Sequence, residues 1–143
     1  MPLTTINQGA FSKLEDLSAW ASETNEFKKE QDNLLRCVDE GRHVKVAPLL
    51  GELGFNRIKG YGYSIWRVTG KIALKATPHY QSLFFPLSIR SGSENAAGEV
   101  QVAGETLTPG TYISFASLIT FDSQLDCLIV YLPETVVPST AGK

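Results

Sequence analysis

Histidine and cysteine are the side chains most often used for metal binding and for acid–base or nucleophilic chemistry, and this sequence contains two of each. His43 and His79 lie alone and far apart in the chain, whereas a metal site needs several ligands that converge on one ion. His79 stands in a predicted turn, where a lone histidine is expected to be solvated. A general acid–base role would need a partner such as Tyr80 or Asp122. The sequence therefore predicts no catalytic residue, no metal site and no cofactor.

The cysteines form no reactive or redox motif. Cys37 and Cys127 lack the Cys-x-x-Cys spacing of a metal or redox site, and Cys127 falls within an apolar segment, which predicts a core position. The first residues have neither the charged start nor the apolar stretch of a signal peptide. No apolar run has the length of a membrane span. We therefore expect reduced thiols and a cytoplasmic protein, or a component of a virus particle assembled in the cytoplasm.

Charge is distributed in blocks along a chain whose formal net charge is −2. Residues 42–90 are rich in Lys and Arg and contain one acidic residue, Glu52, whereas residues 91–142 contain acidic residues and no Lys or Arg. Such blocks indicate an anion-binding face or subunits that associate through complementary charges. The alternative is that the blocks fold beside one another and their charges mix on one surface.

The elements that carry these residues change character along the chain, and residues 12–41 show helical spacing. Ser12 and Glu15 have the spacing of a capping box at a helix start, and Gly41 stands where a helix C-cap is expected. Apolar residues recur at helical intervals: Leu14, Leu17, Ala21, Phe27, Leu34, Leu35 and Val38. The pattern predicts one helix or a pair of helices.

From about residue 43 the pattern favours short strands. In Tyr63–Ala76 the even positions are mostly apolar and the odd positions polar or cationic, which predicts a half-buried strand. Gly70 is expected to mark a bulge or a close approach. Further strands are predicted over 83–89, 99–103, 105–107, 111–121 and 126–132, with Pro86 at an edge or beside a bulge. Strands this short, with turns this frequent, favour an antiparallel sandwich or barrel.

The stretch GEVQVAGETLTPGTYISFA, residues 98–116, and the closing DCLIVYLP, residues 126–133, resemble the second half of a cupin. Gly104 and Pro109-Gly110 stand at the turns between its strands. In cupin enzymes a metal-binding histidine follows the Pro-Gly turn, and Ile113 occupies roughly that position here. The resemblance therefore implies the strands of a cupin without its metal-dependent reaction.

Together these patterns predict an α+β protein in which an N-terminal helical segment precedes an antiparallel β-sandwich or barrel of jelly-roll type. The expected organisation is a helical segment over residues 1–41, a sandwich domain over 42–137 and a flexible tail over 138–143.

The function that the sequence favours is a non-enzymatic structural or protein-interaction module. It would act by homo-oligomeric assembly or with other structural proteins, as in a capsid decoration, connector or fibre-base component of a virion. Arg67, Lys71 and Lys75 would form its electrostatic contact row. One alternative is single-stranded nucleic-acid or anion binding through residues 42–90, with contacts from Tyr61, Tyr63, His79 and Tyr80. A second alternative is a metal-free, cupin-like binder of small molecules; no membrane association is expected.

Overall fold

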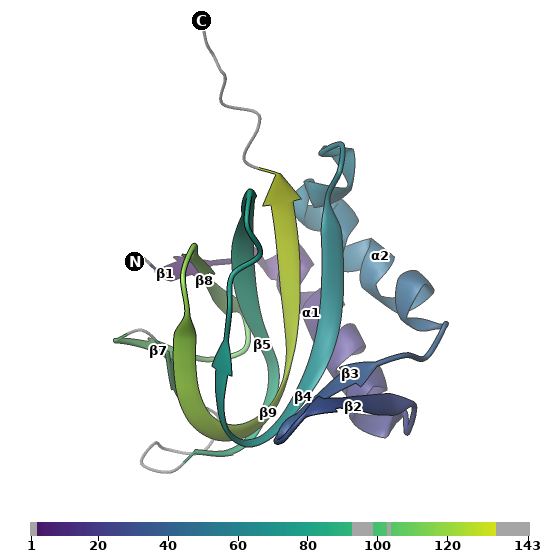
Figure 1. The fold of residues 1–143 in the computed structure, drawn as a ribbon. Coiled ribbons are helices and arrows are strands. Elements are labelled where there is room, and N and C mark those ends of the chain that lie inside the picture. The colour runs from purple at the N-terminus through teal and green to yellow at the C-terminus, as the bar shows by residue number, and fades with distance from the viewer. Residues whose placement is uncertain (1–2, 93–98, 103, 134–143) are drawn as a thin grey trace, which may run out of the picture.

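The computed structural model describes residues 3–92, 99–102 and 104–133, which form helices on one side of a strongly curled sheet (Figure 1). In chain order the elements are β1 (Leu3–Thr5), α1 (Gln8–Glu23), β2 (Phe27–Gln31), β3 (Leu34–Cys37), α2 (Arg42–Leu53), the short 3-10 helix η1 (Phe55–Arg57), β4 (Gly62–Leu74), β5 (Tyr80–Gly92), β6 (Val100–Val102), β7 (Glu105–Leu107), β8 (Thr111–Phe115) and β9 (Ile119–Pro133). The predicted α+β fold with antiparallel strands is confirmed.

The main sheet has seven strands in the order β1-β8-β5-β9-β4-β3-β2, and β6 pairs with β7 in a separate hairpin. All the pairings are antiparallel. β4 pairs with β9 along its whole length without a shift in register, whereas the pairing of β5 with β9 shifts after Pro86 and again after Ile89. The predicted bulge at Pro86 is therefore confirmed.

The pairing shows that the sheet curls back on itself. Leu74 pairs with Ile119 at one end of β9, and Tyr80 pairs with Pro133 at the other end. The chain from Leu74 to Tyr80 can span at most about 20 Å, whereas a straight strand with the 15 residues of β9 would be about 50 Å long. The two ends of β9 must therefore approach each other, and Figure 1 shows β4 and β9 bent into a trough.

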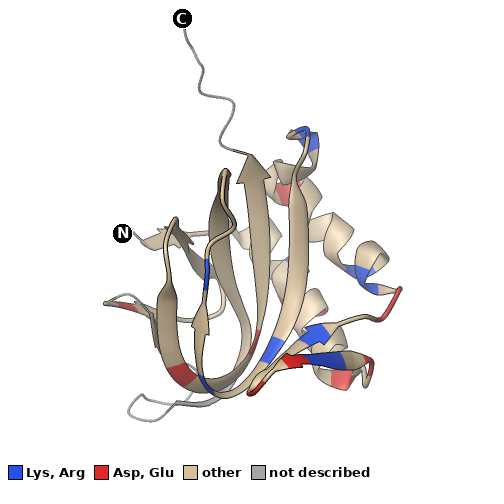
Figure 2. Cartoon of the chain, viewed as in Figure 1, with Lys and Arg blue, Asp and Glu red and all other residues tan. Residues whose placement is uncertain are grey.

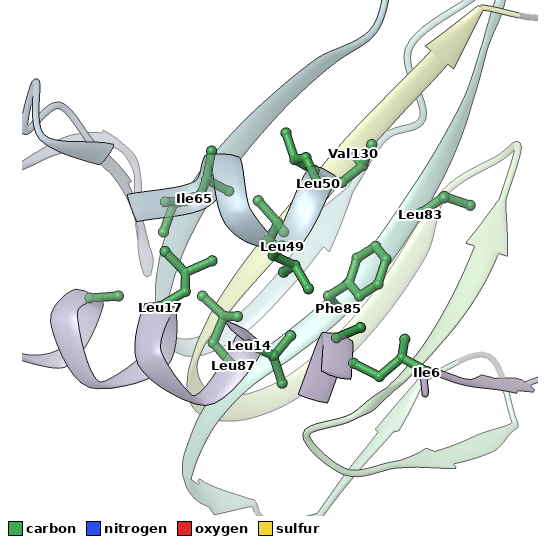
Figure 3. Packing of buried hydrophobic residues seen from close by; sticks show 14 of the residues in the cluster. Ile6, Leu14, Leu17, Leu49, Leu50, Ile65, Leu83, Phe85, Leu87 and Val130 are labelled. Carbon is green, nitrogen blue, oxygen red and sulfur yellow. The ribbon is translucent and has the colours of Figure 1, made fainter. Parts of the chain in front are cut away.

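The convex face of the sheet packs against the two helices. Leu14 and Leu17 of α1 and Leu49 and Leu50 of α2 are fully buried against sheet residues that include Phe85 (Figure 3). Gly110, before β8, fits this packing because a Cβ there would lie 2.8 Å from Cδ1 of Phe11. Its φ of 103° is also one that side chains with a Cβ avoid.

The concave face has a second apolar cluster of its own. It includes the inward residues of β4 that alternation predicted, Val68, Ile72 and Leu74, with Trp66 packed against them. Ile113 is fully buried in this cluster with Phe84. Gly70 is a close-approach point as predicted, because a Cβ there would lie 3.1 Å from the Asn33 side chain.

The N-terminal region differs from the sequence-based prediction. Helix α1 begins one turn earlier than the capping box suggested, because the Asn7 side chain accepts a hydrogen bond from the Ala10 N–H. Residues expected to continue as a helix form the β2–β3 hairpin instead. Gly41, expected to end a helix, is the N-cap of α2, which occupies a stretch expected to begin the strands. Among the described residues, no helix has the length and apolarity needed to cross a membrane.

Candidate functional site

A cleft of about 380 Å³ opens on the concave side of the sheet. Both ends of β4 line it, which follows from the curl of that strand. The lining residues are Glu30, Gln31, Leu34, Trp66, Ala73, Leu74, Lys75, Phe115, Ile129 and Tyr131. The cleft therefore has apolar walls from the concave cluster and polar groups from β2, β4 and β9.

A chain of three polar side chains borders this cleft. The Trp66 indole N–H donates to Ser64 Oγ at 2.6 Å, and Ser64 Oγ lies 2.8 Å from Tyr131 Oη. Strand register brings these residues together, because Gly62 pairs with Tyr131 and Ser64 with Ile129. Ser64 and Tyr131 are thus diagonal neighbours on one face of the β4–β9 pair.

The three hydrogen-bonded side chains carry one more polar hydrogen than the bonds between them use. Trp66, Ser64 and Tyr131 carry one polar hydrogen each. One is used from Trp66 to Ser64 and a second between the two hydroxyls, whichever of them donates. When Ser64 donates to Tyr131, the remaining hydrogen is the Tyr131 O–H, and Tyr131 lines the cleft.

The charged residues of the cleft are not equivalent. Glu30 is neutralised by Arg36, whose Nε lies 2.7 Å from the carboxylate. Lys75, at the exposed end of β4, has no ion-pair partner among residues 3–92, 99–102 and 104–133. The uncompensated charge of the described cleft residues is therefore positive.

Ser82 adds an unsatisfied hydroxyl beside the cleft. It pairs in register with Phe115 on β8 and with Tyr131 on β9, so its side chain faces the same side of the sheet as theirs. The residue is fully buried, and its Oγ has no hydrogen-bond partner in the described structure. A buried hydroxyl without a partner costs free energy, which makes it a place where a ligand or a water is expected.

The predicted electrostatic row is divided between two environments. Arg67 forms an ion pair with the fully buried Asp126, with Nε 2.9 Å from Oδ1. It also donates to the Ala21 carbonyl in α1 and lies over the Phe27 ring. Lys71 and Lys75 are exposed on β4 and just after it. Figure 2 shows Lys and Arg spread over several helices and strands.

The predicted aromatic and histidine contacts lie outside the cleft lining. Tyr61 and Tyr63 pack against the convex cluster, and Tyr63 hydrogen-bonds through its hydroxyl to His43. Burial raises the pKa of Tyr63. His79 is exposed in the β4–β5 turn with a positive φ, and Tyr80 is half-buried at the start of β5. The structure brings His43, not His79, to a tyrosine.

The residues of the concave face do not fit a cupin metal centre. Ile113, at the position of the cupin histidine, is buried among apolar residues. Within the described ranges, no three His, Cys, Asp or Glu side chains gather where they could hold a metal ion. The polar groups of the cleft are hydroxyl, indole, amide, ammonium and one paired carboxylate, a donor set unlike that of a transition-metal site.

Comparisons with protein-family models and with curated proteins found no match to the sequence. Solved structures do match. A prolyl hydroxylase from Trichoplax adhaerens, in complex with a hypoxia inducible factor oxygen degradation domain peptide fragment, matches 96% of this chain and 87% of its own, with 11% identity and a TM-score of 0.59. Ectoine synthase from P. lautus matches 78% of this chain and 71% of its own, with 12% identity and a TM-score of 0.44. A cupin protein from Bacteroides fragilis matches 59% and 75%, with 12% identity and a TM-score of 0.38. The weak cupin-like resemblance of the sequence is confirmed at the level of the fold.

These matches correct the prediction that the protein is not an enzyme. The fold that the chain shares with the prolyl hydroxylase is a fold that carries an enzyme. The scarcity of histidine therefore does not place the chain in a non-enzymatic class. The virion and assembly interpretation gains no support from these matches, and it stays a prediction.

Sequence reasoning missed the residues that define the cleft. Ser64 stands at an inward-facing even position of the β4 pattern, and Ser82 is a polar residue before a run of buried apolar ones. A polar residue on an inward face is a signal for a buried hydrogen bond or a ligand contact. Tyr131 offered no such signal, because its contact with Ser64 depends on the register of strands distant in sequence.

Proposed function

We propose that this protein binds a small organic molecule in the cleft on the concave side of its curled sheet. The observation that carries the proposal is the chain Trp66–Ser64–Tyr131, which ends in a free O–H donor beside apolar walls. A concave, mostly apolar site with a few placed polar groups is the usual form of a small-molecule site. The cleft volume, about 380 Å³, suits a small ligand.

The fold match supports this proposal over assembly into a virion. The prolyl hydroxylase with the same fold is in complex with a peptide fragment, which supports ligand binding by a protein of this fold. The unpartnered Ser82 hydroxyl, placed between Phe115 and Tyr131, agrees with a ligand at this end of the concave face. If the ligand is also a substrate, it would contact the same hydroxyl groups, those of Tyr131 and Ser82.

The test is a thermal-shift screen of small metabolites against the wild-type protein and the Tyr131→Phe variant. A ligand that binds the native state raises Tm with concentration, and we expect hits whose shift falls in Tyr131→Phe because the hydroxyl that lines the cleft is lost. Tyr112→Phe is the matched control, since Tyr112 stacks on Phe85 on the convex side. Hits that respond equally to both substitutions would place binding elsewhere, and a screen without hits would count against the proposal.

A further inference from the structure

Apart from the Gln31 amide, which can donate or accept, the free side-chain groups that we assign to the cleft are hydrogen-bond donors. This property narrows the class of ligand, and the inference rests on the proposed function. The spare O–H of the Ser64–Tyr131 pair donates, and the Lys75 ammonium offers only N–H donors. The one carboxylate among the lining residues, Glu30, is already bound to Arg36. A ligand group that accepts hydrogen bonds therefore finds donors at both Tyr131 and Lys75.

The charge of the cleft points in the same direction. With Glu30 neutralised by Arg36 at 2.7 Å, the charge that remains on the described lining residues is the cation of Lys75. An ionised carboxylate has acceptor oxygens only, carries the opposite charge, and can take bonds from both kinds of donor at once. An ammonium group on a ligand would meet the like charge of Lys75, and the one carboxylate of the described lining, Glu30, is already paired with Arg36.

The apolar walls of the cleft indicate the chemistry of the rest of the ligand. Leu34, Leu74, Phe115 and Ile129 present apolar surface that a nonpolar body would cover. We propose that the cleft takes a small carboxylic acid with a compact apolar or aromatic body. Its carboxylate would lie toward Lys75 and the free hydroxyl donor, and its body against these four residues.

Isothermal titration calorimetry with matched probes tests this inference. The probes are benzoate and phenylacetate, their neutral amides benzamide and phenylacetamide, and the cation benzylamine. We expect the acids to bind about two- to five-fold more tightly than their amides, as for a solvent-accessible ion pair, and more weakly as ionic strength rises. Benzylamine is expected to bind most weakly.

Substitutions assign the preference to named groups. Lys75→Met should abolish the difference between acid and amide, Lys75→Arg should retain it, and Lys71→Met, an exposed lysine that does not line the cleft, should leave it unchanged. Tyr131→Phe should weaken acid and amide alike by about five-fold, the effect of one lost hydrogen bond. Circular dichroism checks that each variant is folded.

The outcomes separate this inference from the proposed function. If the amides or benzylamine bind as tightly as the acids, the inference is wrong and cleft binding stands. The same holds if the metabolite screen yields Tyr131-dependent hits that are neutral or cationic. If neither the acids nor any screened compound binds, both the inference and the proposed function fail.

Discussion

Breaking the ion pair between Arg67 and Asp126 should destabilise this protein more than any exposed charge substitution. The pair joins β4 to β9, and Arg67 also holds the end of α1 through the Ala21 carbonyl at 2.8 Å and lies 4.1 Å above the Phe27 ring. The Asp126 side chain is 0% exposed and that of Arg67 is 21% exposed. Removal of one partner from such a pair leaves a charge that water cannot fully solvate.

The burial of the two partners ranks the expected losses. Arg67→Met removes a cation paired with a fully buried carboxylate and should cost about 3 to 5 kcal/mol, the range for breaking a buried pair. Asp126→Asn leaves a guanidinium that is partly reached by water, so it should cost about 3 kcal/mol. The double variant Arg67→Met/Asp126→Leu should lie close to wild type, because apolar replacement of a whole buried pair is often neutral.

Urea denaturation, followed by tryptophan fluorescence and circular dichroism, measures these free energies of unfolding. Arg36→Met is the matched control, since it breaks the Arg36–Glu30 pair, whose side chains are 41% and 35% exposed, and should cost less than about 1 kcal/mol. A loss below about 1 kcal/mol in Arg67→Met, or a double variant as unstable as the sum of the single variants, would refute the assignment of this pair as a buried clamp.

Four further substitutions probe other features of the fold. Gly110→Ala places a Cβ 2.8 Å from Phe11 at a φ of 103° and should cost at least about 2 kcal/mol by urea denaturation; Gly104→Ala, with open space around it, should cost about 1 kcal/mol. Burial raises the pKa of the Cys127 thiol above its ordinary value of 9.0. Stability that this thiol contributes below pH 9 is therefore lost as the pH rises. Between pH 9 and pH 10 the Cys127→Ala variant should lose about 1 kcal/mol less stability than wild type; an equal loss would argue against this explanation. Ser82→Ala should raise the stability of the ligand-free protein by up to about 1 kcal/mol, since it removes an unsatisfied buried hydroxyl; a clear loss of Tm would show that the hydroxyl has a structural partner.

Alternation predicted β4 well, whereas β9 was divided between the predicted strands 111–121 and 126–132, and its second half is buried on both faces. Val68, Ile72 and Leu74 face the concave cluster as the pattern of β4 requires. The hairpin turns at Gly104 and Gly110 also have the positive φ values that glycine tolerates. Local sequence carries this information, since it depends only on which residues alternate and which turns need glycine.

The β2–β3 hairpin escaped prediction because its apolar residues also match a helical interval. Leu34 packs into the concave cluster and Cys37 into the convex one, so this short strand is apolar on both faces. The missed signal was Asp32-Asn33, where Asn33 adopts a φ of 65° in the turn. Helix α2 was obscured in the opposite way, by Pro48 and Gly51 within its length.

The candidate cleft depended on information that no short segment contains. Ser64 and Tyr131 meet because β4 and β9 pair in one register, and a shift of one residue would turn Tyr131 to the other face. The partition of the cationic row has the same origin, because only the pairing of Arg67 with Asp126 shows that its charge is buried. Sequence thus predicted the class of the fold, whereas the site follows from the order and register of the strands.

The place of β9 in the sheet also has a consequence for how the chain folds during synthesis. β9 is the last described strand in the chain, yet it lies between β5 and β4 and pairs with both along most of their length. Until the ribosome has released residues 119–133, β4 and β5 have open edges, and α1 and α2 lack the continuous surface they cover. Nascent chains that stop before β9 should therefore expose apolar edges and aggregate. Folding of this domain is expected to follow translation of its final strand rather than to accompany synthesis of its helices.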